Sequence, residues 1–169
     1  ERVEEALTIL KRAYELEPQN PSVLNHLASH YFYRGNYEMA LTLSKRAHEN
    51  SDGQAKAIQA ESCYHMARSY HAQGENGKAL QWYTVAHKTN PEYLAPQFGL
   101  GQMYLMNKED KKAVACFERV IRAQPTNVEA LKVLGYLYAK DGRDTDALAK
   151  LNLATEHAPT DASVWLELG

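Results

Sequence analysis

The chain has 169 residues, 44% of them hydrophobic, and its 19 basic and 21 acidic side chains give a formal net charge of −2. This balance offers no basic field for a phosphate backbone or an anionic membrane, so we expect neither direct nucleic acid binding nor membrane binding. No apolar run approaches the roughly 20 residues of a membrane-spanning helix, and no leader pattern follows Glu1, which predicts a soluble chain that is not a precursor. We expect Cys63 and Cys116 to be buried, reduced thiols of a cytosolic or nuclear protein.

A 34-residue period runs through the chain and is marked by Pro91, Pro125 and Pro159. The residues before these prolines follow the pattern W-x2-L-G-x2-Y, A-x3-F and P, which is typical of the tetratricopeptide repeat (TPR). The matching residues are Leu100, Gly101, Tyr104, Ala113 and Phe117 in one register and Leu134, Gly135, Tyr138, Ala147 and Leu151 in the next. The resemblance implies an all-α fold, a TPR α-solenoid in which antiparallel helix pairs, A and B, stack into a right-handed superhelix.

In chain order, we expect a single TPR array over residues 1–169. Its expected parts are helix B of a truncated repeat at 1–20, a repeat with a five-residue insertion at 21–59, three further repeats at 60–93, 94–127 and 128–161, and the start of another helix A at 162–169. Neither end shows a polar capping helix, so we expect the chain to be excised from a longer solenoid.

The insertion lies between Ala47 and Gln59, because Tyr31 and Tyr70 occupy the same repeat position but are 39 residues apart. An Asp-Gly turn signal falls in this segment, and residues 54–73 are predicted to form one lengthened helix A. Two interpretations stay open. The insertion is either an exposed loop without a role or a site that changes the superhelical pitch or contacts a partner.

Glycines mark the predicted turns from helix A to helix B at Gly35, Gly74 and Gly142. The chain leaves helix A through a left-handed residue, and glycine adopts that conformation without steric cost. The repeat at 94–127 has Asn107 and Lys108 at this turn instead. Asparagine tolerates the left-handed region better than most residues, so we expect it to preserve the turn at a small cost.

The resemblance to TPR proteins implies that the A helices line an inner groove that receives a partner. The expected partner-binding residues occupy the repeat positions that face this groove, and they are Asn25, His26, Ser29, Phe32, Tyr33, Tyr64, His65, Arg68, His71, Phe98, Gln102, Leu105, Lys132 and Tyr136. The groove is aromatic and weakly charged, which suits an extended or helical peptide anchored by apolar side chains. The alternative is that individual aromatic residues pack on a neighbouring helix.

Some TPR domains clamp the C-terminal carboxylates of their partners with lysine, asparagine and arginine at fixed repeat positions. The residues at these positions do not form that clamp in either possible frame; they are Asn25, Ser29, His65, Ala95 and Gly99 in one frame and Tyr64, Arg68, Gly99, Glu129 and Val133 in the other. A binding mode based on the clamp is therefore disfavoured.

We expect no catalytic residues, no metal, no cofactor and no small-molecule substrate. His26 and His30 have the i, i+4 spacing of a zinc pair, but no third ligand is directed toward them. The glycines at 99 and 101 form G-x-G without the third glycine or the preceding strand of a nucleotide loop. No nucleophile lies at a plausible spacing from a base, so we predict an interaction module rather than an enzyme.

Three stretches, 23–28, 59–64 with 67–71, and 98–104, resemble the TPR scaffold subunits of the RNA polymerase II-associated factor (PAF) complex. These stretches include groove residues that the repeat pattern does not dictate. The resemblance implies a nuclear scaffold that binds other PAF subunits and RNA polymerase II and supports transcription elongation and co-transcriptional histone modification. The alternative is a generic TPR adaptor that binds a hydrophobic or aromatic peptide segment of an unrelated partner.

Overall fold

The computed structural model describes the backbone of residues 2–160 and the side chains from residue 5 onward. The part that would begin the predicted helix A at 162–169 lies outside the described residues. Within them the chain is all-α, as expected, and forms the helices α1 (Arg2–Leu16), α2 (Pro21–Tyr33), α3 (Tyr37–Glu49), α4 (Lys56–Ala72), α5 (Asn76–Thr89), α6 (Ala95–Met106), α7 (Asp110–Ala123), α8 (Val128–Lys140) and α9 (Asp144–His157).

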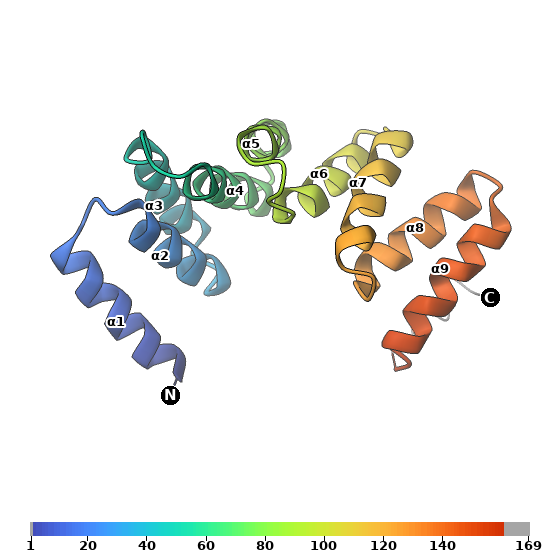
Figure 1. The fold of residues 1–169 in the computed structure, drawn as a ribbon, viewed down its shortest axis with the longest axis horizontal. Helices are drawn as coiled ribbons and strands as arrows, with labels where there is room; N and C mark the ends of the chain where they lie inside the picture. The colour runs from blue at the N-terminus through green and yellow to red at the C-terminus, as the bar shows by residue number, and fades with distance from the viewer. Residues whose placement is uncertain (1, 161–169) are drawn as a thin grey trace. The chain divides into compact units, whose positions relative to one another are not determined.

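The helices belong to two compact units, Glu1–Pro96 (unit 1) and Gln97–Gly169 (unit 2). In unit 1, α2 packs against α3 and α4 packs against α5, so each pair forms a helical hairpin (Figure 1). Contacts of α3 with α4, of α2 with α4 and of α1 with α2 join these elements. Leu24, Leu27, Ala28, Leu43 and Ala47 form a buried cluster between α2 and α3, against which side chains of α1 pack.

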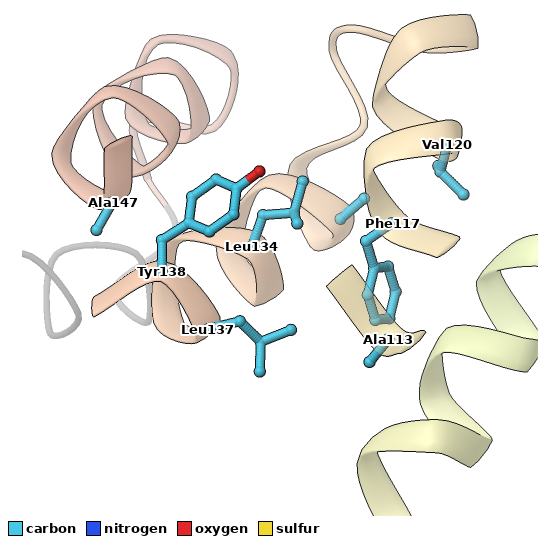
Figure 2. Packing of buried hydrophobic residues seen from close by; sticks show 8 residues of the cluster. Ala113, Phe117, Val120, Leu134, Leu137, Tyr138 and Ala147 are labelled. Atoms are coloured by element: carbon cyan, nitrogen blue, oxygen red, sulfur yellow. The ribbon is translucent and has the colours of Figure 1, made fainter. Parts of the chain in front are cut away.

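In unit 2, α8 packs against both α7 and α9. Its main cluster draws buried residues from all three helices, and Figure 2 shows Phe117 of α7 together with Leu134 and Tyr138 of α8. Tyr138 also reaches out of the cluster, because its hydroxyl donates a 2.6 Å hydrogen bond to Oε1 of Glu118.

Two glycines allow the helices of unit 2 to approach closely. A methyl group on Gly101 of α6 would lie 2.7 Å from the Phe117 ring, and one on Gly135 of α8 would lie 2.6 Å from Cγ of Leu151. Both glycines occupy the motif position at which the sequence predicts a small residue. The absence of Cβ therefore sets the distance between helix A and helix B in these hairpins.

The turns between helices A and B contain left-handed residues, as the glycines predict. Gly35, Gly74 and Gly142 have φ values of 77°, 78° and 75°. In the turn after α6, the left-handed residue is Lys108, with φ of 58°, and not Asn107. The expectation for Asn107 was wrong because Lys108, and not Asn107, occupies the turn position that Gly74 and Gly142 hold in the neighbouring repeats. The place in the turn decides which residue becomes left-handed.

The extra residues of this repeat mostly lengthen α4, which has 17 residues where α2 and α8 have 13, and the connection between α3 and α4 is anchored to the helices. Ser51 is buried, and its carbonyl accepts a 2.9 Å hydrogen bond from Nε2 of Gln59. Gly53 is left-handed, with φ of 75°, as an Asp-Gly turn requires. Helix α4 begins at Lys56, two residues later than the predicted start at Gln54.

Both cysteines are buried free thiols, as predicted. Burial raises the pKa of each thiol to about 11, so neither has the thiolate character of a reactive cysteine. Among the described residues, no helix has the length and apolar character needed to cross a membrane.

Candidate protein-binding site

The side chains with the most unusual environment in unit 1 come from the two neighbouring helices α2 and α4. Pro21 at the first turn and the Asn20 side chain, which accepts hydrogen bonds from the Ser22 and Val23 amides, begin α2. Tyr64 and Arg68 are four residues apart on α4 and therefore lie on the same face of that helix. Because α2 packs against α4, this face meets the C-terminal end of α2.

Arg68 is surrounded by aromatic rings and is only 7% exposed. Its guanidinium carbon lies 4.1 Å from the ring centre of Phe32, 5.2 Å from that of Tyr33 and 5.4 Å from that of Tyr64. These distances are in the range of cation–π interactions, each of which contributes on the order of 1 kcal/mol. We call these four residues the arginine–aromatic cluster.

Arg68 is a buried cation without an ionic partner in the described part of the chain. No carboxylate there lies within ion-pair distance of its guanidinium. Its Nε and Nη2 atoms are shielded from solvent and have no hydrogen-bond partner among the described residues. Buried charges in proteins are generally paired or hydrogen-bonded, so this arrangement calls for a functional explanation.

A row of polar residues continues along the same two helices. Asn25 is fully buried and donates hydrogen bonds to the Ile58 carbonyl (3.3 Å) and to Oε2 of Glu61 (3.4 Å). The other carboxylate oxygen of Glu61 lies 3.6 Å from Nε2 of His65. Glu61 is thus directed toward Asn25 and His65 and away from an ion pair with Arg68.

The environment shifts the pKa values of this row. The contact with His65 lowers the pKa of Glu61 below its ordinary value, although burial opposes this effect. Burial lowers the pKa of His65, and the contact with Glu61 opposes that shift only in part. A neutral His65 beside an ionised Glu61 is therefore the favoured state near neutral pH.

Buried Tyr83 and half-buried Tyr93 add aromatic rings next to Tyr64 that the sequence does not predict for the groove. Their ring centres lie 6.1 Å and 5.6 Å from that of Tyr64, and the Tyr83 ring is also 6.3 Å from the His71 ring. Burial raises the pKa of Tyr64 and of both neighbouring tyrosines, so all three are neutral phenols. Tyr83 occupies a packing position of the repeat, and Tyr93 lies in a connection that the repeat pattern does not describe. The sequence therefore did not predict either residue as part of the groove.

Unit 1 brings together most of its predicted groove residues, but with different exposures. Tyr33 is 79% exposed, whereas Asn25 and His65 are buried. His26 is exposed, and its Nδ1 lies 2.7 Å from the Ser22 carbonyl oxygen. Ser29 and His71 are half-buried.

In unit 2, the predicted groove residues are more dispersed. Phe98 packs edge-on against Phe117 at 5.3 Å, and Leu105 packs against the same buried cluster. Gln102 is half-buried, and Lys132 lies 3.1 Å from the carboxylate of Glu129. Tyr136 is 50% exposed, so it presents a larger fraction of its surface than Phe98 and Leu105, which are half-buried.

A family model described as tetratricopeptide repeat matches residues 64–127 and 111–162, which together make up more than half of the chain. The chain belongs to the tetratricopeptide repeat family. Among solved structures, the chain is similar to Pseudomonas aeruginosa PilF, with a TM-score of 0.82 and 18% identity over 98% of this chain and 73% of that chain. It is also similar to YrrB, described as a TPR protein, with a TM-score of 0.69 and 19% identity over 98% of this chain and 82% of that chain. The predicted TPR fold is therefore confirmed.

The TPR chain is also similar to CTR9 proteins. It is 38% identical to the Arabidopsis thaliana "Protein CTR9 homolog" over 95% of this chain, and 38% identical to the Caenorhabditis elegans "RNA polymerase-associated protein CTR9" over 79% of this chain. It spans only 15% and 12% of the length of these two relatives. The predicted resemblance to a TPR subunit associated with RNA polymerase is confirmed.

Proposed function

We propose that these TPR repeats are a non-catalytic protein-interaction segment of a nuclear scaffold of the PAF transcription elongation complex. The similarity to CTR9 proteins over almost the whole chain is the observation that carries this proposal. One of these relatives is named as RNA polymerase-associated. In the proposed role, the repeats bind other PAF subunits, RNA polymerase II or both.

The composition of the arginine–aromatic cluster supports a role in binding. Arginine and tyrosine are enriched among the few residues that contribute most of the energy of protein interfaces. The cluster contains one arginine and two tyrosines. Its Arg68 lies between Phe32, Tyr33 and Tyr64 and retains hydrogen-bond donors without a partner among the described residues. The cluster supplies apolar area and directional polar contacts at the same place.

The chain would support co-transcriptional histone modification indirectly, by holding the assembled complex on the elongating polymerase. No chemical step is assigned to its own side chains. Since the chain spans a small part of its relatives, the partners of these particular repeats form a subset of those of the whole protein.

Affinity capture from nuclear extract tests this proposal. A tagged form of the 169-residue chain is immobilised, and bound proteins are identified by mass spectrometry with and without an excess of untagged chain. We expect PAF subunits or RNA polymerase II to be recovered and to be displaced by the untagged chain. Recovery of chaperones alone would contradict the proposal, and recovery of one unrelated partner would favour the generic adaptor.

Crosslinking mass spectrometry of the intact complex then locates the contact. We expect crosslinks from a partner subunit to lysines near the A helices, such as Lys56 before the cluster and Lys132 on α8. Crosslinks confined to lysines of the B helices, such as Lys45 and Lys78, would assign binding to the opposite face.

A further inference from the structure

The two unpartnered nitrogens of Arg68 have a specific geometry. Nε and Nη2 lie on the same edge of the planar guanidinium group, so their N–H bonds point in nearly parallel directions. This edge is a fork that matches the two oxygens of a carboxylate and forms paired, charge-assisted hydrogen bonds with it. Both donors of this fork lack partners within the described part of the chain, whereas the flat surface of the guanidinium is occupied by rings.

We propose that the Arg68 fork binds the carboxylate of an aspartate or glutamate side chain in a partner protein segment that lies along α2 and α4. The proposal deepens the proposed function and rests only on its protein-binding part. It names the chemistry of one anchor residue of the partner. It also explains why an arginine is buried among aromatic rings with no carboxylate from residues 5–160 paired to it.

The surroundings of Arg68 favour such a carboxylate. The rings of Phe32, Tyr33 and Tyr64 exclude water, and an ion pair is stronger in such a site than at an exposed surface. The nearest acidic residue on this face of α4, Glu61, is engaged with Asn25 and His65. Among the described residues, the positive charge of Arg68 therefore stays uncompensated on this face of α4.

A side-chain carboxylate fits the site better than the C-terminal carboxylate of a partner. Arg68 lies at depth behind aromatic rings, and a glutamate reaches such a cation on a stem of two apolar methylene groups. A terminal carboxylate would carry peptide N–H and C=O groups into the aromatic environment, where they would lose hydrogen bonds to water. The clamp residues that receive C-termini in other TPR domains are also missing from these positions.

Access to the fork requires a side chain to move, and Tyr33 is positioned to do so. The fork nitrogens are shielded from solvent, yet Tyr33, one of the rings that covers Arg68, is 79% exposed. Tyr33 is the last residue of α2 and is followed by the turn that contains the left-handed Gly35. Rotation of this exposed ring is the movement that would open a path to Arg68, while Phe32 and Tyr64 remain in contact with the guanidinium.

Selection from a displayed peptide library tests the proposal directly. Random peptides of about 12 residues, long enough to follow two neighbouring helices, are fused through their C-termini so that no free terminal carboxylate is present. They are selected on the 169-residue chain and counter-selected on Arg68→Met. We expect the retained sequences to share an aspartate or glutamate next to apolar residues. Retained sequences without a shared acidic position would overturn the proposal.

A selected peptide and its variants then measure the contribution of the fork. Replacing the shared Glu by Gln should weaken binding about tenfold or more, because a charge-assisted pair is lost. Arg68→Lys should weaken binding of the original peptide similarly, because lysine keeps the charge but lacks the fork. Amidated and free-acid forms of the peptide should bind equally well. Binding that needs a free C-terminus, or that is unchanged in both Arg68 variants, would overturn the proposal.

Stability measurements separate binding from a structural role of Arg68. Arg68→Met removes three cation–π contacts, but it also removes a buried charge that has no ionic partner among the described residues. Because these two effects oppose each other, the Tm should change by less than about 4 °C. A much larger fall in Tm in both Arg68 variants would assign the residue to the core and overturn the proposal. If acidic peptides bind but no PAF subunit is captured from nuclear extract, the site stands and only the assignment to the complex fails.

Discussion

The guanidinium carbon of Arg68 lies 4.1 Å from the centre of the Phe32 ring, although the two residues belong to different helical hairpins. Neither position is one that the TPR pattern requires. Their contact joins α2 to α4 on the side where the partner is expected to bind. The positions of the side chains on this surface therefore depend on how the two neighbouring repeats pack against each other.

The exposed aromatic residue of α8 provides a test of which face binds partners. Tyr136 on α8 and Leu148 on α9 are each 50% exposed, but they lie on a helix A and a helix B, respectively. We expect Tyr136→Ala to reduce the recovery of partners from nuclear extract severalfold, because it removes an interface anchor. Leu148→Ala is the matched control and should leave recovery unchanged.

Both of these substitutions are at exposed positions and should alter the free energy of unfolding by no more than about 0.5 kcal/mol. Circular dichroism and urea unfolding check this point. If Leu148→Ala reduces recovery and Tyr136→Ala does not, the B helices form the binding face.

The stability of the chain should fall on acidification in two steps. Burial lowers the pKa of His65 below its ordinary value of 6.5 and has the same effect on His71. The unfolded chain therefore binds protons more readily, so the free energy of unfolding is fully retained above pH 6.5 and decreases as the pH falls toward the folded-state pKa. The lowered pKa of Glu61 predicts a second decrease below its ordinary value of 4.5.

Urea unfolding across this pH range tests the assignment. His65→Gln should flatten the decline that begins below pH 6.5, because the residue that gains a proton on unfolding is removed. His71→Gln should separately flatten the same decline, because burial lowers the pKa of that histidine as well. An unchanged slope in His65→Gln would show that His65 is not the residue that causes the first step.

Two glycine substitutions should change stability in opposite directions. A methyl group on Gly135 would lie 2.6 Å from Cγ of the buried Leu151, whereas one on Gly77 of α5 would meet nothing within 4 Å. We expect Gly77→Ala to raise the free energy of unfolding by about 0.5–1 kcal/mol, because alanine is the better helix former. Gly135→Ala should lower it by about 1 kcal/mol or more, because overpacking exceeds that gain. Equal stabilisation by both would mean that α8 and α9 can separate without cost.

The turn after α6 contains backbone strain that a glycine substitution should relieve. Lys108 is left-handed, with φ of 58°, a conformation that costs a residue with a side chain about 1–2 kcal/mol. Lys108→Gly should therefore raise the free energy of unfolding by up to about 1 kcal/mol, after allowing for the greater flexibility of glycine in the unfolded chain. Lys111→Gly, in the first turn of α7, is the control and should lower it. If the free energy of unfolding decreases in both variants, the left-handed conformation of Lys108 is not a source of strain.

The sequence by itself determined the helical hairpins, their turns and their close crossings. The repeated prolines and glycines carry this information because they act through the local backbone, and the small residues at 101 and 135 face the next helix of the same hairpin. The burial of Cys63 and Cys116 follows from the same periodicity. These features need only contacts between residues that are near one another in the chain.

Only the tertiary structure decided which groove residues meet and which are packed away. Phe98 contacts Phe117, Tyr93 joins the surface around Tyr64, and Arg68 lies among rings from two helices. A repeat pattern assigns each side chain a direction, but its partner depends on how closely and at what angle two helices cross. The depth of Arg68 and the free edge of its guanidinium arise from that crossing, since no periodic signal specifies which side chains surround a residue on a neighbouring helix.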